Sequence, residues 1–425
     1  MRSRRGKARR GTSAALAGAA ALGLGLLTAV PAAAQPAKPI VVGVAGPACP
    51  APAFATITAA ATAAPAGSTI TVCPGTYTGT VVVTKPLTFL GARRGVDART
   101  GRTNPLAESV VDGGGGAGFR IEPGVSGVTI DGFTIRNAGT PQQRADGIDA
   151  FNGGSGFTIA DNIITETSFG VNLNSNGATP STITRNRFVD NNRTGGQGGS
   201  GVFVSSGPGN NLAIIDNLFR GHSSAAVNTA GDPSRASTGL RIERNQSIDD
   251  ATFAVIVNAR GASVANNQIV RAPATAVPIG SAILVGGNTT GVMVAGNAIA
   301  GGDATGIRVS NAFGPPNVGL TVAGNQIVNR QDGIRLTRQT SGRISGNEVA
   351  GSSNVGILLD RDADAAGMPI PVDNTGVTVS GNQLAGNRVA DCQDTSSGTG
   401  TAGTANTWTG NIGFRSSPAG LCSLF

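Results

Sequence analysis

Four acidic or imidazole side chains recur at a nearly constant distance behind a repeated asparagine, and together they could carry out acid–base chemistry. Asp190, His222, Asp249 and Asp250 follow that asparagine by four or five residues. If consecutive repeats stack at about 4.8 Å, Asp190 and Asp249 are two repeats, or roughly 10 Å, apart. Carboxylates near this separation can act as acid and base across a water molecule, and a histidine between them can transfer protons. We predict these four residues as the catalytic set; the alternative is an ordinary solvated polar face.

Three further residues are predicted to bind the substrate. Glu166 and Arg271 extend the same column by one repeat at each end, and a guanidinium can hold a carboxylate through two parallel hydrogen bonds. Phe203 is the nearest aromatic residue expected to face solvent. Insertions rich in Gly and Pro, which often wall the binding face of a repeat protein, occur at 190–200, 229–238 and 271–281.

A short acidic run raises the question of a metal. Asp360, Asp362 and Asp364 alternate in the run DRDAD, as calcium ligands do, but the Gly and terminal Glu of a helix–loop–helix calcium site are missing. Calcium therefore stays a minor hypothesis beside an exposed acidic loop. We predict no other cofactor and no other metal, because the four cysteines have no zinc-site spacing and the chain has a single histidine.

The element that would position these residues is a repeat. One pattern recurs between residues 127 and 387: two β-branched residues, then Asn, then an aliphatic residue. The Asn positions are 162, 186, 217, 245, 267, 297, 325, 347 and 382, in steps of 22 to 35 residues. Self-similarity at this period indicates a solenoid.

The second half of each repeat identifies the kind of solenoid. A leucine-rich repeat shares the first half, but it needs a helix or comparable return segment in the second. Here the second half alternates apolar and polar residues with period two, as in GVNLN at 170–174 and GIRVS at 306–310. Each coil therefore holds at least two strands, which predicts an all-β fold, a parallel β-helix.

The repeated Asn has a structural interpretation. A sharp bend between strands commonly needs a residue with left-handed dihedral angles, which Asn tolerates. Stacked asparagines can also form hydrogen-bonded ladders. We predict that the Asn residues build the shape rather than bind a ligand.

The chain resembles the secreted right-handed parallel β-helix repeat proteins, the fold of pectate lyases, polygalacturonases and pectin methylesterases. The resemblance covers about residues 52–390 and is most specific at its start, 53–92, where an Ala-rich segment precedes PGTY. It implies a single-stranded right-handed β-helix whose open end is plugged by a short helix. The expected organisation is a signal peptide (1–34), a linker (35–51), the β-helix (52–390) and a C-terminal cap closed by a disulfide (391–425).

Two short motifs resemble polygalacturonase chemistry but cannot act together. DGID at 146–149 resembles the acidic motif of that family, and GIRL at 333–336 resembles the basic one. Asp149 and Arg335 are predicted to lie seven coils apart, about 34 Å, so they cannot meet at one substrate. No single family's catalytic signature is complete.

The N-terminus predicts export. A basic segment precedes an apolar run from Ala14 to Val30 and then Ala32-Ala33-Ala34, the pattern of a cleavable signal peptide. Six of the eight net positive charges leave with it, so the mature chain is close to neutral and a nucleic-acid partner is not expected. No later segment is long and apolar enough to span a membrane. In an oxidising compartment we predict the disulfides Cys49–Cys73 and Cys392–Cys422.

These observations predict a secreted monomeric β-helix protein that binds or processes an extracellular polysaccharide as a lyase-like or hydrolase-like enzyme. The alternative is a non-enzymatic cell-surface or matrix protein whose coil wall binds a partner.

Overall fold

A computed structural model describes residues 40–100, 102–194, 198–205, 207–230, 234–271, 280–310, 316–361 and 373–424. The predicted signal peptide and two of the predicted calcium ligands, Asp362 and Asp364, lie outside these ranges. Within them, no helix has the length and apolar character that a membrane span requires.

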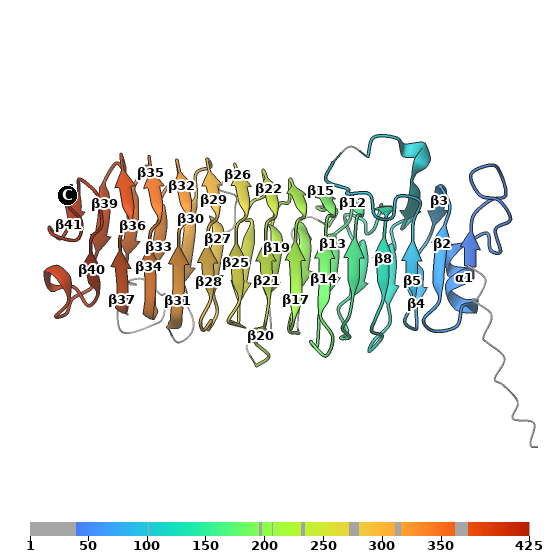
Figure 1. The fold of residues 1–425 in the computed structure, drawn as a ribbon, viewed down its shortest axis with the longest axis horizontal. Coiled ribbons are helices and arrows are strands. Elements are labelled where there is room, and N and C mark those ends of the chain that lie inside the picture. Colours follow the sequence, from blue (N-terminus) through green and yellow to red (C-terminus); the bar gives the residue numbers. More distant parts are fainter. Residues whose placement is uncertain are drawn as a thin grey trace, which may run out of the picture. The chain divides into compact units, whose positions relative to one another are not determined.

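The chain winds into coils that stack in sequence order, and each full coil contributes one strand to each of three parallel sheets (Figure 1). The first sheet has 14 strands, the second has 12 and the third has 13. The predicted right-handed parallel β-helix is confirmed, with three strands in a coil.

The first sheet, in order, contains β1 (Ile40–Val42), β2 (Thr69–Val72), β5 (Thr88–Leu90), β8 (Thr129–Asp131), β11 (Thr158–Ala160), β14 (Ser181–Thr184), β17 (Leu212–Ile215), β21 (Arg241–Glu243), β25 (Ser263–Ala265), β28 (Met293–Ala295), β31 (Asn317–Ala323), β34 (Gln339–Ser345), β37 (Thr375–Ser380) and β40 (Thr407–Thr409). The second contains β3 (Gly75–Thr78), β6 (Ser109–Asp112), β9 (Phe133–Arg136), β12 (Ile163–Thr165), β15 (Arg187–Val189), β18 (Leu218–Arg220), β22 (Gln246–Ile248), β26 (Gln268–Val270), β29 (Ala298–Ala300), β32 (Gln326–Val328), β35 (Glu348–Ala350) and β38 (Gln383–Ala385). The third contains β4 (Val81–Val83), β7 (Phe119–Ile121), β10 (Ile148–Ala150), β13 (Phe169–Leu173), β16 (Ser200–Val204), β19 (Ala225–Ala230), β23 (Ala254–Val257), β27 (Ser281–Gly286), β30 (Thr305–Ser310), β33 (Ile334–Leu336), β36 (Val355–Leu359), β39 (Ala390–Asp394) and β41 (Ser416–Ser417).

Beside these sheets, β20 (Ser237–Thr238) pairs with β24 (Ala259–Arg260), and two 3-10 turns, η1 (Pro105–Ala107) and η3 (Thr401–Gly403), lie in connections.

The core is a column of inward side chains, because alternate residues of each short strand point into the coil. Val, Ile and Leu fill most of it, and like residues stack on like. The rings of Phe188 and Phe219, on neighbouring coils, are parallel with centroids 4.9 Å apart. Stacking of the same side chain at the same inward position explains why a repeat with few aromatic residues still packs a continuous core.

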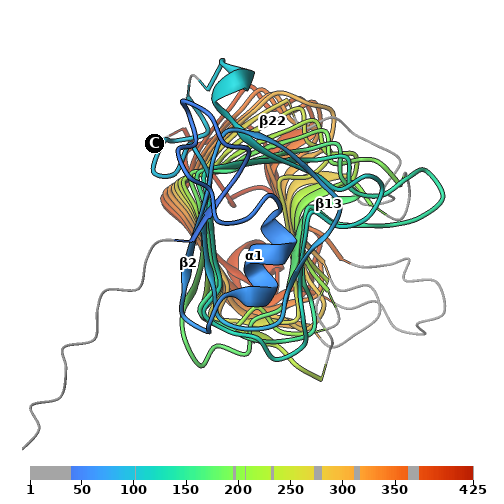
Figure 2. The ribbon, with the colours of Figure 1, turned by 90° about the vertical axis from the view of Figure 1, so that its right-hand side faces the viewer.

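The predicted plug at the N-terminal end is confirmed as α1 (Ile57–Ala63), which lies across the end of the coil (Figure 2). Thr56 caps it by accepting a hydrogen bond from the amide of Ala59. Ile57, Ala60 and Ala61 are buried against the first coils. An apolar helix at this position covers strand edges that would otherwise be open to pairing.

Ten buried asparagines form a ladder between the first and second sheets: the nine predicted ones and Asn411, which was not predicted. We call Asn162, Asn186, Asn217, Asn245, Asn267, Asn297, Asn325, Asn347, Asn382 and Asn411 the Asn ladder. Each Oδ1 after the first accepts hydrogen bonds from the backbone amide and the Nδ2 of the preceding member, as Asn267 does from Asn245 at 2.9 and 3.1 Å.

One detail of that prediction is wrong. The left-handed residue of each bend is the one before the asparagine, for example Asp161, Arg185 and Gly296. The reason is geometric: the Asn side chain must point into the coil to reach its neighbours, so the preceding residue turns the chain.

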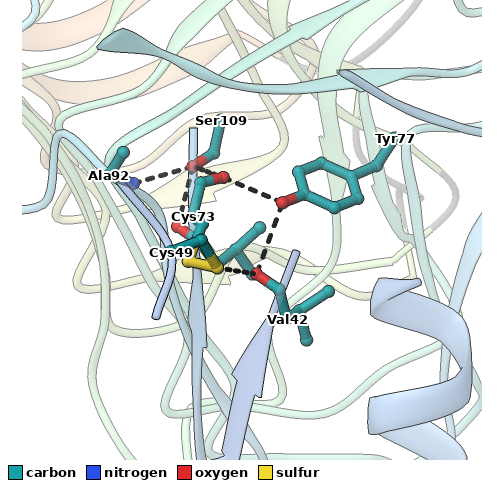
Figure 3. Close-up of a disulfide and its surroundings, with 7 residues drawn as sticks. Val42, Cys49, Cys73, Tyr77, Ala92 and Ser109 are labelled. Carbon is teal, nitrogen blue, oxygen red and sulfur yellow. Dashed lines mark hydrogen bonds between the residues drawn. A yellow bond between two sulfur atoms is a disulfide. The ribbon is translucent and has the colours of Figure 1, made fainter. Parts of the chain in front are cut away.

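The disulfide Cys49–Cys73 is confirmed, with a Cα–Cα distance of 5.7 Å. It joins the segment after β1 to the end of β2 (Figure 3). The hydroxyl of Tyr77 donates to the carbonyl of Cys73 at 2.9 Å, and the hydroxyl of Ser109 approaches the same carbonyl at 3.0 Å. Burial raises the pKa of Tyr77. These contacts fix the first coils to one another.

The predicted second disulfide is not formed in this structure. Cys392 and Cys422 are separate thiols joined by a hydrogen bond between their side chains. Burial raises the pKa of the Cys392 thiol, whereas the hydrogen bond with Cys392 lowers the pKa of Cys422. The prediction of a disulfide-closed C-terminal cap is therefore wrong for this structure, although the two thiols are neighbours as the pairing required.

Candidate functional site

The outward members of the predicted catalytic column lie on the bend between the second and third sheets. Glu166, Asp190, Asp249 and Arg271 all have left-handed backbone angles there, with φ between 50° and 59°. Arg271 and Asp249 lie on neighbouring coils, and the guanidinium holds the carboxylate at 3.0 and 3.1 Å. The Arg271 side chain is largely exposed and that of Asp249 is partly exposed, and each neutralises the other.

The other two predicted catalytic residues are inside the coil. Gly221, and not His222, occupies the bend position between Asp190 and Asp249. His222 and Asp250 lie one residue further along the chain and are 1% and 0% exposed. The column inferred by counting therefore combined two positions, because a shift of one residue after a bend exchanges an outward side chain for an inward one.

The buried pair belongs to a hydrogen-bonded chain. His222 Nδ1 and Asp250 Oδ1 are 2.6 Å apart, and Ser247 donates to Asp250 Oδ2 at 2.6 Å. Asn191 Nδ2 lies 3.1 Å from His222 Nε2, and Thr167 donates to Asn191 Oδ1. The amide donor at Nε2 assigns the proton of the neutral ring to Nδ1. With both ring nitrogens engaged, this network ties four coils together.

Phe203 leads to a different part of the surface, the outward face of the third sheet. Its ring stacks on that of Phe169 at 4.4 Å, and the guanidinium of Arg144 lies 4.5 Å from the Phe169 centroid and 5.8 Å from that of Phe203. A cation over two rings is favourable. Arg144 thus fixes the loop before β10 against the sheet.

That loop closes one side of a hollow of about 320 Å³. Its floor consists of outward residues on three successive coils, Arg120 in β7, Asp149 in β10 and Asn172 in β13, which are Cα partners in the sheet. Arg144 and Asp146 from the loop, and Phe151 just after β10, complete the charged and aromatic lining.

The local sequence explains this placement. Asp146 ends the loop, and Gly147 follows it at the start of the third-sheet segment. A Cβ on Gly147 would lie 2.6 Å from the carbonyl oxygen of Gly170 on the next coil. Only glycine lets the coils approach this closely, so the chain enters β10 with Asp146 buried and Asp149 facing outward.

The two carboxyl groups differ in their surroundings. Asp146 is buried, and its Oδ2 accepts hydrogen bonds from Arg144 at 3.2 Å and from Asn172 at 3.0 Å. Burial raises the pKa of Asp146, and Arg144 opposes that shift. For Asp149, burial and then the charge of Asp146 raise the pKa to about 6, and its buried Oδ1 accepts no hydrogen bond. Asp149 is therefore the group that can exchange a proton near neutral pH.

Two arginines supply positive charge beside Asp149. Arg120 is half-exposed and pairs with Glu122 at 3.2 Å. Arg144 pairs with Asp146 and has about a third of its side chain exposed. Guanidinium groups bind carboxylates through paired hydrogen bonds. The hollow thus combines a titratable carboxyl group with cations that can hold an acidic ligand.

A second hollow, of about 500 Å³, lies beyond Phe151, which lines both. It is lined by the side chains of Asn152, Asn174, Asn176, Asn210 and Arg235, together with Pro208. Most of these residues belong to the connections between the third and first sheets.

Asp149 of the DGID motif lines the first hollow, whereas the site was predicted at the column of Asp190 and Asp249. The predicted separation of Asp149 from Arg335 is confirmed, since seven coil steps lie between β10 and β33. Arg335 instead pairs with Asp360, the one predicted calcium ligand within the described residues. The signal that could have indicated the hollow is the occurrence of Arg120 and Asp149 at the same strand position on adjacent coils, with Arg144 and Asp146 just before the second strand.

Two families match the sequence. The one described as "Right handed beta helix region" matches residues 76–247, and the one described as "Periplasmic copper-binding protein (NosD)" matches residues 234–417. No curated protein sequence matches the chain.

Copper does not fit the residues present. No three His, Cys, Asp or Glu side chains converge anywhere in the described ranges. Both ring nitrogens of His222 are also engaged in hydrogen bonds.

Several solved structures share the fold. A structure described as "a new PL6 alginate lyase complex with trisaccharide" is 14% identical with a TM-score of 0.56, over 84% of this chain and 81% of that one. DFA-IIIase from Arthrobacter chlorophenolicus A6 in complex with GF2 is 15% identical with a TM-score of 0.48, over 81% and 88%. The periplasmic alginate epimerase AlgG is 12% identical with a TM-score of 0.44, over 84% and 77%.

At these identities the likeness shows the fold alone, and the two structures with TM-scores below 0.5 support no conclusion. The stacked coils, the two family matches and the first of these structures agree on one description. The chain is a right-handed parallel β-helix protein.

Proposed function

We propose that this protein binds and processes an acidic polysaccharide in the hollow beside Asp149. The observation that carries the proposal is a carboxyl group whose pKa is raised to about 6, in a hollow that Arg120 and Arg144 also line. We also propose that the protein acts outside the cytoplasm, as the signal-peptide pattern and the disulfide Cys49–Cys73 favour.

Each group has a definite part in this chemistry. The arginines would hold the carboxylate of a uronate residue and stabilise the negative charge that develops when a proton leaves the adjacent carbon. Asp149, ionised for the most part at pH 7, would accept that proton. The bond from the next carbon to the glycosidic oxygen would then break to leave a double bond, and the leaving oxygen would take a proton from water. Asp146 would stay hydrogen-bonded to Arg144 and Asn172 and keep the proton affinity of Asp149 high.

The alginate lyase of similar fold makes alginate a sensible first polymer to test, because its structure holds a trisaccharide. Polygalacturonate is the second, from the resemblance in sequence. Both are chains of uronate residues, so both offer the carboxylates that the two arginines would bind.

The decisive experiment compares Asp149→Asn with the matched variant Asp249→Asn. Both remove one outward-facing carboxylate, but Asp249 lies on the bend beside Arg271 and not in the hollow. Release of unsaturated or reducing chain ends from alginate and polygalacturonate is expected to fall by about 100-fold or more in Asp149→Asn. It should change little in Asp249→Asn. The reverse result would place the catalytic site in the column that contains Asp190 and Asp249. Equal activity of the wild type and both variants would exclude a catalytic role for Asp149 and for Asp249.

A binding role without catalysis is the second candidate. It is favoured by the state of Asp146, which is buried and occupied by Arg144 and Asn172, so only one carboxyl group is available in the hollow. Retention of these polymers by the wild-type protein, without any new chain ends, would favour this candidate. Loss of that retention in Arg120→Ala would then place the bound polymer at the hollow.

A further inference from the structure

We propose that the second hollow, beyond Phe151, is a subsite for the neighbouring sugar residue of the same chain and recognises it through a hydroxyl group. This inference rests on the proposed function, because it extends the ligand held beside Asp149. Its volume of about 500 Å³ is within the usual range of ligand sites.

The first argument is the state of Asn174. This residue is 7% exposed, and its Nδ2 donates to the carbonyl oxygen of Phe151. Its Oδ1 is buried and has no hydrogen-bond partner. A buried acceptor without a partner is costly, and native proteins retain few of them. Because Asn174 lines the hollow, a ligand there can supply the missing donor.

The missing group is a donor, which restricts the chemistry of the ligand. A sugar hydroxyl can donate to Asn174 Oδ1, whereas an ionised carboxylate has no proton to give. The other polar lining groups are mainly amides, those of Asn152, Asn176 and Asn210, and the described residues that line the hollow include no carboxylate. Arg235 adds a positive charge at the rim. The subsite is therefore suited to the hydroxyls of a sugar, whether or not that sugar also carries a carboxylate.

The second argument is the position of Phe151. Phe151 is 38% exposed and lines both hollows, so it would lie between the sugar held beside Asp149 and the next sugar of the chain. An exposed aromatic face gives a sugar ring apolar contact that the amides do not. The two hollows with one ring between them fit two successive sugar residues.

The test measures saccharide binding in a background that cannot turn the ligand over. Tetrasaccharides of alginate and of polygalacturonate, each with its carboxyl-reduced counterpart, are titrated calorimetrically into Asp149→Asn. Asn174→Ala and Phe151→Ala are then added separately to that background. The control is Asn374→Ala, a buried asparagine far along the stack whose side chain is fully bonded, to Leu336, Asp360 and the amide of Gln339.

We expect Asn174→Ala to weaken tetrasaccharide binding roughly three- to tenfold, the value of one lost hydrogen bond. Phe151→Ala should weaken it roughly two- to tenfold. Asn374→Ala should leave it unchanged. The effect of Asn174→Ala should persist with the carboxyl-reduced tetrasaccharides, because the proposed contact is made by a hydroxyl. Phe151 is partly exposed, so that variant keeps the test valid if Asn174→Ala does not fold.

Unchanged affinity in both variants would overturn the subsite, as would failure of every tetrasaccharide to bind. The proposed catalysis fails separately. If Asp149→Asn retains full activity on the polymers while binding still depends on Asn174 and Phe151, the subsite stands and the catalytic role of Asp149 falls.

Discussion

Removal of one rung of the Asn ladder should destabilise the protein far more than its small change in volume suggests. In Asn267→Ala, four side-chain hydrogen bonds are lost. Oδ1 accepts two from Asn245, at 2.9 and 3.1 Å, and Nδ2 donates to Ile242 at 3.0 Å and to Asn297 at 2.9 Å. At about 1 kcal/mol each, these bonds contribute about 4 kcal/mol.

The groups left behind add to that cost. The backbone amide of Asn245 loses its acceptor and the carbonyl of Ile242 loses a donor, both in the interior of the coil. An unpaired buried polar group costs about 1–3 kcal/mol. With about 4 kcal/mol for the bonds and at least about 1 kcal/mol for each of the two unpaired groups, the free energy of unfolding of Asn267→Ala should fall by about 6 kcal/mol or more.

The assay is urea denaturation followed by far-UV circular dichroism, with Gln268→Ala as the matched control. Gln268 is the next residue, has an exposed side chain and begins β26. An exposed substitution of this kind should change stability by about 0.5 kcal/mol or less. A loss below about 1 kcal/mol in Asn267→Ala, equal to that of the control, would refute the idea that the ladder stabilises the stack.

Three other outcomes follow from the same structure. Replacing Cys49 and Cys73 by Ser should lower the free energy of unfolding by about 3.5 kcal/mol, because the bridge closes a loop with a sequence separation of 24 residues; an unchanged urea midpoint would contradict this. His222→Ala leaves the carboxylate of Asp250 buried beside an empty space and should cost about 3 kcal/mol by the same assay; a loss under about 1 kcal/mol would show that the pair is not needed. Asp149→Asn should gain stability at pH 7.5. The pKa of Asp149 is raised from 3.8 to about 6 in the folded protein, so ionisation of Asp149 lowers the free energy of unfolding. This loss is absent below pH 3.8, where the carboxyl group is protonated in both states, and is complete above pH 6. We expect a gain of about 1–2 kcal/mol at pH 7.5, after allowance for partial exposure, and none at pH 3.5; equal stability of the two proteins at both pH values would contradict the raised pKa.

The fold could be predicted because each coil carries a short local sequence pattern and this pattern repeats along the chain. A strand of three residues with one β-branched side chain inward is a weak signal, but the same signal beside an asparagine nine times over is strong. The Asn ladder followed from that repetition, because identical units that stack must place identical residues in contact. The plug α1 was predicted from the resemblance to known β-helix proteins.

The candidate site was harder to predict because a stacked repeat depends on register. Counting residues from the Asn ladder gave the correct alignment of the coils as far as the second sheet. At the next bend the alignment was wrong by one residue, so the predicted column combined the inward His222 with the outward Asp190. Counting along the third sheet predicted Asp149, Asn172, Phe203 and Asn228 as one outward column, which is confirmed, but it then chose the buried Ile256 where Val255 is the partner of Asn228.

The sequence by itself determined the parallel β-helix, the ladder and the pairing of Cys49 with Cys73, since each depends on a pattern or on neighbours in the chain. Only the tertiary structure decided which carboxylates face solvent and which are buried. The pKa of Asp149 and the unpaired oxygen of Asn174 depend on what the loop before β10 and the adjacent coils place around them. Burial and electrostatic surroundings are properties of residues brought together from different coils, and no local pattern in the sequence encodes them.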